Sequence, residues 1–189
     1  MNQVLTGNRE PARGPWAWFR VRSLAGGLAM SVIVGLLSSG SLQAQDEPRI
    51  SGEYKIEKGT RSGWLIVTVE IPNGSHIYAL TQQGNPPPTR LQLAESETVA
   101  VLEPFRADKP PVVVEHDPVF EQRVEKHDGG KVRFMAPIRV AEGAGIETLA
   151  IDLKFHGQIC SETGCKPLFN KPVETRFTGY YVPRKPDDG

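Results

Sequence analysis

The chain has 189 residues, with 22 lysines and arginines against 22 aspartates and glutamates, so its formal net charge is zero. This balance argues against a nucleic-acid binder, which would carry a basic excess. A hydrophobic content of 39% is enough for one core and too low for a protein with many membrane spans. Two cysteines exclude a disulfide-dense miniprotein and a four-cysteine zinc site. The 16 prolines and 19 glycines indicate turns and strand ends rather than long helices.

Residues 1–44 predict a secretory signal peptide. Four arginines precede an apolar stretch from Leu24 to Leu37, and small and polar residues follow up to Ala44, the expected cleavage point. An uncleaved membrane or lipid anchor is the alternative, but an apolar run of about 14 residues is shorter than the roughly 20 that span a bilayer. Cleavage would leave 18 basic and 21 acidic residues, a net charge of −3.

The remaining chain alternates apolar and polar side chains, which is the pattern of β-strands. The pattern is strongest in residues 63–71, 131–140 and 149–155, and we expect the turn at 72–75 to end the first of these strands. Weaker candidates are residues 50–57, 89–93, 99–102, 112–115, 120–125 and 173–179. Short strands separated by turns predict an all-β fold, and we favour a single immunoglobulin-like antiparallel β-sandwich over residues 45–182. Residues 183–189 are polar and are expected to form a disordered tail.

Both cysteines, Cys160 and Cys165, lie in one short segment and are separated by four residues. Gly164 in this spacer can take a positive φ and help a tight turn to bring the sulfurs together. We expect the preceding strand to end near Phe155, which places Cys160 at or just beyond a strand end. Pro167 cannot donate a ladder hydrogen bond, so pairing is interrupted there or confined to a sheet edge.

Three interpretations of this segment are open. A structural disulfide would pin a hairpin, although a loop of about six residues gives less stability than the roughly 3 kcal/mol expected for a 15-residue loop. A redox-active dithiol needs an accessible sulfur and neighbours that tune its thiolate: Lys166 would favour the thiolate of Cys165, and Glu162 would disfavour it. A metal site with His156 is the third, but a strand and turn lack helical i, i+4 geometry, so we expect no metal. The other histidines are scattered without ligand spacing: His76, His116 and His127.

Three segments in order carry a resemblance to a known family. They run from Pro72 to Tyr78, from Gly84 to Leu91 and from Phe155 to Pro167. They resemble the G-W-H-I-Y, G-x-P-T-x-L and cysteine motifs of the N-terminal periplasmic domain of the thiol:disulfide interchange protein DsbD. The resemblance covers residues 50–178, although Ser75 stands where the family often has an aromatic residue or glycine.

The resemblance implies an immunoglobulin-like sandwich that carries electrons. In this family a cysteine pair is reduced by a membrane-embedded partner through a thioredoxin-like domain, and it reduces exported acceptors such as disulfide isomerases and cytochrome-maturation proteins. By position, Cys160 and Cys165 would be the redox pair, with Cys165 forming the mixed disulfide. The family shields its pair with a loop that bears an aromatic residue, which would be Phe120 here. Tyr78 matches a tyrosine near the pair. The ordinary alternatives are a strand-start core residue for Phe120 and a sandwich-edge aromatic for Tyr78.

The sequence therefore predicts an exported thiol:disulfide oxidoreductase domain, periplasmic or secreted, with no cofactor and no nucleic-acid partner. Full-length family members continue into a membrane segment and a thioredoxin-like domain that this sequence lacks, so we expect a thioredoxin-like or membrane reductase to act in trans. Exported disulfide-containing proteins would be the acceptors. The alternative is a non-catalytic binding module in which the Cys160–Cys165 disulfide is structural.

Overall fold

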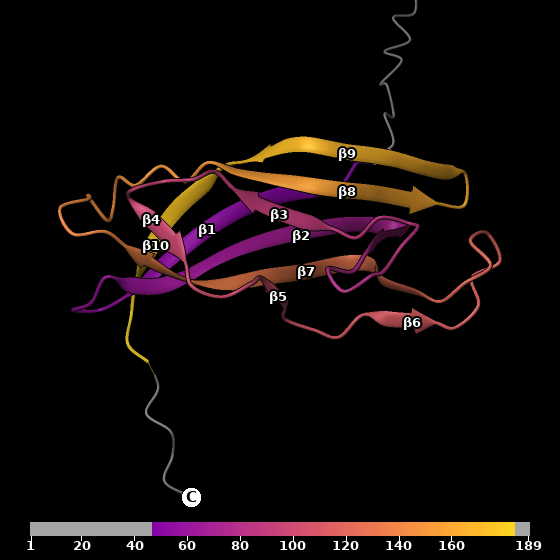
Figure 1. Cartoon of the computed structure of the whole chain (residues 1–189), viewed down its shortest axis with the longest axis horizontal. Helices are drawn as coiled ribbons and strands as arrows, with labels where there is room; N and C mark the ends of the chain where they lie inside the picture. Colours follow the sequence, from indigo (N-terminus) through magenta and orange to yellow (C-terminus); the bar gives the residue numbers. More distant parts are fainter. Residues whose placement is uncertain (1–46, 184–189) are drawn as a thin grey trace, which may run out of the picture. The chain divides into compact units, whose positions relative to one another are not determined.

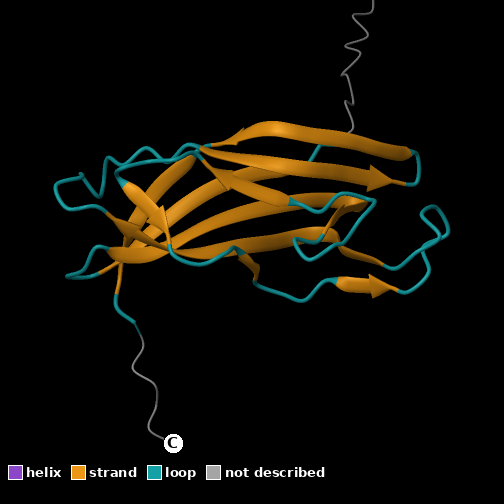
Figure 2. Ribbon diagram, viewed as in Figure 1, coloured by secondary structure: helices purple, strands orange, loops and turns teal. Residues whose placement is uncertain are grey.

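A computed structural model describes residues 47–183, so the predicted signal peptide and all but the first residue of the predicted tail lie outside the described residues. Every regular element in residues 47–183 is a β-strand, which confirms the all-β prediction (Figure 1, Figure 2). Accordingly, this part of the chain contains no helix long and apolar enough to cross a membrane. The strands are β1 (Arg49–Glu57), β2 (Ser62–Tyr78), β3 (Arg90–Leu93), β4 (Val99–Val101), β5 (Arg106–Ala107), β6 (Val112–Val114), β7 (Val124–Val140), β8 (Leu153–Ser161), β9 (Gly164–Val173) and β10 (Thr175–Tyr181).

The two longest strands, β2 and β7, pair antiparallel along most of their length and organise the fold. β1 pairs with the first part of β2, and β8 pairs with its last part through residues 75–77. β3 and β9 in turn pair with β8, while β4, β5 and β6 pair with β7. Among the described strands β1 and β10 form the single parallel pair, and every other pair is antiparallel as expected. The long strands therefore change partners along their length, which lets the strands form two facing layers.

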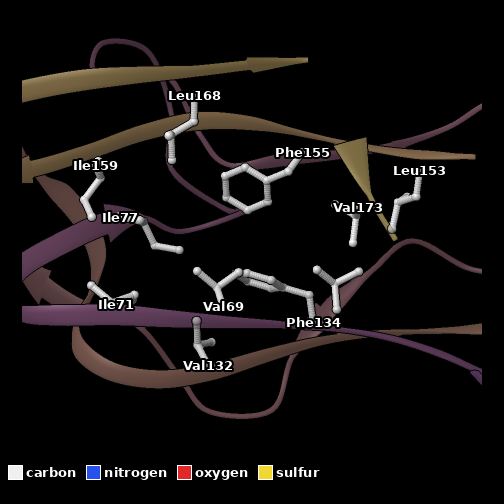
Figure 3. Close-up of a cluster of buried hydrophobic side chains, with 11 residues drawn as sticks. Val69, Ile71, Ile77, Val132, Phe134, Leu153, Phe155, Ile159, Leu168 and Val173 are labelled. Atoms are coloured by element: carbon white, nitrogen blue, oxygen red, sulfur yellow. The ribbon is translucent and has the colours of Figure 1, made fainter. Parts of the chain in front are cut away.

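The main core lies between these layers (Figure 3). Because side chains alternate along a strand, one face of β2 and β7 is apolar and packs against the apolar face of β8 and β9. The buried side chains of this cluster are Val67, Val69, Ile71, Ile77, Val132, Phe134, Leu153, Phe155, Ile159, Leu168 and Val173. A second cluster includes Tyr54, Leu65 and Ile138. Each fully buried large aliphatic or aromatic side chain contributes roughly 1.5–3 kcal/mol, so these clusters hold the layers together.

Two predicted strand ends are wrong. The turn at residues 72–75 does not end β2, which continues to Tyr78 after a register shift between Ile71 and His76. Gly74 and Gly130, on the two strands that flank this irregularity, adopt φ values of 76° and 111°, so a bulge forms where a turn was expected. The strand predicted over residues 149–155 begins only at Leu153, and as β8 it continues to Ser161 rather than ending near residue 155.

Two further differences concern the strands nearest the cysteines. β9 was not predicted, because its prolines and exposed polar residues hide the alternation. Pro167 is nevertheless accommodated, because β9 pairs only with β8 and is an edge strand. The sequence predicted either an interrupted pairing or a sheet edge at this proline, and the structure has the sheet edge. β7 begins at Val124, so Phe120 lies in the preceding loop and is not a strand-start residue.

Candidate functional site

Cys160 and Cys165 form a disulfide across the β8–β9 hairpin, with an S–S distance of 2.05 Å and 4.0 Å between their Cα atoms. The two residues face each other directly in the strand register, and the chain reverses at residues 162–163. Gly164 has a φ of 134°, a conformation that favours glycine, and it starts the returning strand. Cys160 is the penultimate residue of β8 and therefore lies at a strand end, one of the two predicted positions, although that strand ends at Ser161 and not near Phe155.

The two cysteines differ in their exposure to solvent. Cys160 is 2% exposed, whereas Cys165 is exposed. A small cavity of about 130 Å³ adjoins the disulfide, and Ser75 and Lys166 are among the residues that line it. Since a thiolate must reach a sulfur in order to exchange with it, the Cys165 side of the disulfide is the accessible one.

Tyr78 and Phe120, both singled out from the sequence, pack together beside the buried cysteine. Cys160, Tyr78 and Val124 form one buried cluster, and the half-buried Phe120 packs against it. The rings of Tyr78 and Phe120 meet edge to face with centroids 6.0 Å apart. The fold thus joins three predicted site residues that come from β8, β2 and the loop between β6 and β7.

Phe120 is held by a loop that closes on itself, and we call residues 115–123 the cap loop. The Asp117 carboxylate accepts hydrogen bonds from the backbone N–H groups of Val119 and Phe120, at 2.9 and 3.1 Å. The backbone of Asp117 also bonds to Glu121 and Gln122. Figure 1 shows this loop, after β6, at the same end of the molecule as the tip of the β8–β9 hairpin. The sequence HDPVF therefore encodes a compact turn that presents an aromatic ring to the site.

The backbone of Tyr78 is held by residues 84–91, the proline-rich segment that forms the second motif of the resemblance. The buried hydroxyl of Thr89 donates a hydrogen bond of 2.6 Å to the carbonyl oxygen of Tyr78. On the next residue, the N–H of Ala79 donates to the carbonyl of Glu125 at 2.8 Å. Burial, together with the nearby Asp117 carboxylate, raises the pKa of Tyr78 to about 12. Its hydroxyl therefore keeps its proton throughout the physiological pH range.

His76 belongs to the same site, although the sequence analysis found no role for it. It faces Cys160 across the β2–β8 pair, and its Nε2 lies 3.3 Å from the Tyr78 hydroxyl oxygen. The His76 and Tyr78 rings also meet edge to face at 5.3 Å. The sequence feature that could have identified His76 is its position two residues before Tyr78, because residues two apart in a strand lie on the same face.

Lys166 is exposed in β9, where it faces Ile159 of β8, and it lines the small cavity beside the disulfide. Its effect on the Cys165 thiolate stays a prediction. His156 also lies in β8, opposite Arg90 of β3. Within residues 47–183, no group of three or more histidine, cysteine, aspartate or glutamate side chains is arranged to hold a metal ion.

A cavity of about 1130 Å³ lies away from both cysteines. It is bounded by β3 and by the segment that joins β4 to β5, and Leu80, Leu91 and Phe105 contribute apolar walls. Those side chains also pack against the main core, so this cavity is the open side of the sandwich.

Neither a protein-family model nor a curated protein matches this chain. The case for a function therefore stands on the geometry around the disulfide and on the sequence motifs.

Proposed function

We propose that this chain is an exported thiol:disulfide exchange domain, related to the N-terminal periplasmic domain of DsbD, that passes electrons through Cys160 and Cys165. The observation that carries the proposal is the unequal exposure of the two cysteines beneath an aromatic cap. Cys165 is open to solvent, while Cys160 is buried with Tyr78 and Phe120. A disulfide with one accessible sulfur and one protected sulfur suits sequential attack and resolution.

The exchange reaction has two steps. In the reduced protein, the Cys165 thiolate attacks a disulfide of the acceptor, forms a mixed disulfide and releases one acceptor thiolate. The Cys160 thiolate then attacks the sulfur of Cys165, which closes the Cys160–Cys165 disulfide and releases the second acceptor thiolate. Two electrons have passed to the acceptor, and a dithiol donor restores the reduced protein by the reverse sequence. No cofactor takes part, because the sulfurs carry the electrons.

The cap loop would protect the dithiol between encounters. Phe120 packs against the cluster that contains Cys160, so this ring covers the buried sulfur, while Cys165 stays open to a docking partner. Thioredoxin-like or membrane-bound reductases would be the donors, and exported proteins with reducible disulfides would be the acceptors. The cell envelope or the extracellular space is the compartment in which such a reaction is useful.

Trapping of the mixed disulfide tests this function. The Cys160→Ser variant, expressed with its own export signal, should accumulate a covalent complex with acceptor proteins on non-reducing gels, because the resolving thiol is gone. Cys165→Ser should trap no partner, and the double serine variant is the matched control. Absence of any cross-linked species from Cys160→Ser would contradict the carrier function.

A structural disulfide is the second candidate, and the direct facing of the two cysteines within one hairpin favours it. In that case the chain is a binding module and the bond only fixes the end of the hairpin. The reduction potential separates the two functions, since structural disulfides lie below about −300 mV and exchange-active ones lie higher.

A further inference from the structure

We propose that His76 accepts the proton of the Cys160 thiol in the resolving step, an inference that rests on the proposed exchange function. His76 would then be a catalytic base of the reaction and not only a packing residue of the strand. Three observations carry this assignment: the burial of Cys160, the register of β2 against β8, and the contact between His76 and Tyr78.

Burial creates the need for an internal base. Cys160 must lose its proton before it can attack, because the thiolate is the nucleophile. Its residue is 2% exposed and sits among the side chains of Tyr78, Val124 and Phe120, which carry no basic group. An apolar environment disfavours a thiolate, and water reaches the sulfur poorly. A neutral imidazole beside the thiol would meet both difficulties.

The strand register puts His76 in the required place. Residues that face each other on antiparallel strands have Cβ atoms about 4.5–5.5 Å apart and lie on the same face of the sheet. His76 and Cys160 are such a pair. The Tyr78 hydroxyl oxygen lies 3.3 Å from Nε2 of His76, and Tyr78 belongs to the cluster that contains Cys160, so the imidazole lies on the face of the sheet that carries this cysteine.

The surroundings of His76 favour its neutral imidazole. Burial is the main cause that lowers the pKa of His76, and the Lys126 ammonium lowers it further. Asp128, beside it on β7, and Asp117 of the cap loop oppose this effect. Glu162 of the hairpin turn and His76 both line a cavity of about 360 Å³, together with Lys126 and Asp128. A neutral histidine is the form that can accept a proton.

The step balances in atoms and electrons. His76 takes the proton from the Cys160 thiol, and the resulting thiolate attacks the sulfur of Cys165 in the mixed disulfide. The bond between Cys165 and the acceptor sulfur breaks, and its electron pair stays on the acceptor sulfur. The imidazolium then returns the proton to that thiolate. The protein dithiol is oxidised, the acceptor disulfide is reduced, and His76 is regenerated.

A small aromatic disulfide, dithiobis(nitrobenzoate), isolates the resolving step in the full chain. Reduced protein mixed with this reagent should release coloured thiolate in two phases. The first phase reports attack by Cys165, and the second reports closure by Cys160. The second phase is absent from Cys160→Ser, which identifies it.

The His76→Gln variant keeps a polar side chain beside Tyr78 but cannot take up the proton. It should slow the second phase by about 100-fold, the lower end of typical general-base effects, and leave the first phase unchanged. His156→Gln, which alters a histidine of β8 that faces Arg90 of β3 and lies outside the cluster around Cys160, is the matched control and should change neither phase. An unchanged second phase in His76→Gln would overturn the assignment.

The wild-type protein supplies a test that depends on no variant. The rate of the second phase should fall as the pH drops through the pKa of His76, below the ordinary imidazole value of about 6.5, and this bend should be missing in His76→Gln. A wild-type profile without the bend refutes the role of His76. The exchange function is judged separately by partner trapping, so the two proposals can fail independently.

Discussion

The rings of Tyr78 and Phe120 meet almost at a right angle, 89° between planes, and together they enclose the buried side of the Cys160–Cys165 disulfide. Tyr78 comes from the end of β2, and Phe120 comes from the cap loop that follows β6. One ring is anchored in the sheet and the other in a loop. The contact therefore joins a strand residue to a loop residue, and the loop position depends on the turn around Asp117.

Removing the cap ring should expose the dithiol. In Phe120→Ala we expect reduced protein to react several-fold faster with small disulfides and with dissolved oxygen, because access to the sulfurs controls their reactivity. Stopped-flow oxidation measures the rate. Val119→Ala is the matched control, since Val119 is the adjacent residue and its side chain is 78% exposed. Equal rates in wild type and Phe120→Ala would show that the ring shields nothing.

The turn of the cap loop depends on the Asp117 carboxylate. Asp117→Ala removes the carboxylate that accepts hydrogen bonds from the N–H groups of Val119 and Phe120. Loss of a side-chain acceptor that caps backbone N–H groups costs about 1 kcal/mol, so we expect the protein to be destabilised by that amount. The substitution should also raise the reactivity of the dithiol in the same direction as loss of the Phe120 ring. Asp117→Asn keeps an oxygen acceptor and should restore both properties. Failure of this rescue would place the effect in the charge of Asp117 instead.

Reduction of the disulfide should leave the fold intact. The bond closes a loop of only about six residues, so its loss should lower the free energy of unfolding by about 2 kcal/mol. The main core involves neither cysteine. Urea unfolding with and without a reducing agent gives the difference. Complete unfolding on reduction would mean that the disulfide is structural, and it would favour the binding-module function.

The buried hydroxyl of Tyr78 links stability to high pH. Its pKa in the folded protein is about 12, above the ordinary value of 10.0, so the folded state holds this proton more tightly than the unfolded state does. The resulting stability is complete below pH 10 and is lost as the pH rises from 10 toward 12. Tyr78→Phe should therefore flatten the fall in melting temperature over this range. Tyr180 is exposed and its pKa is raised by a smaller shift, so Tyr180→Phe is the comparison and should flatten the fall less. A fall in Tyr78→Phe as steep as in the wild type would contradict the linkage.

Alternation along the chain predicted the strands that carry the core, because half-buried strands place apolar residues at every second position. It failed where strands are not half-buried in this way. β9 lies at an edge with mostly exposed residues, and β2 passes through Pro72 and Gly74 as a bulge. Local residues that are typical of turns were overruled there by pairing with β7 and β8.

Local sequence is enough to predict that this protein is built of strands and that its two cysteines lie close enough to pair across a short turn. Those properties follow from side-chain periodicity and from chain length between the sulfurs. Only the folded structure shows that Cys160 is buried and Cys165 is exposed, and that His76, Tyr78 and Phe120 gather on the side of Cys160. Burial and cross-strand neighbours depend on how distant segments stack, and a local pattern does not encode that relationship.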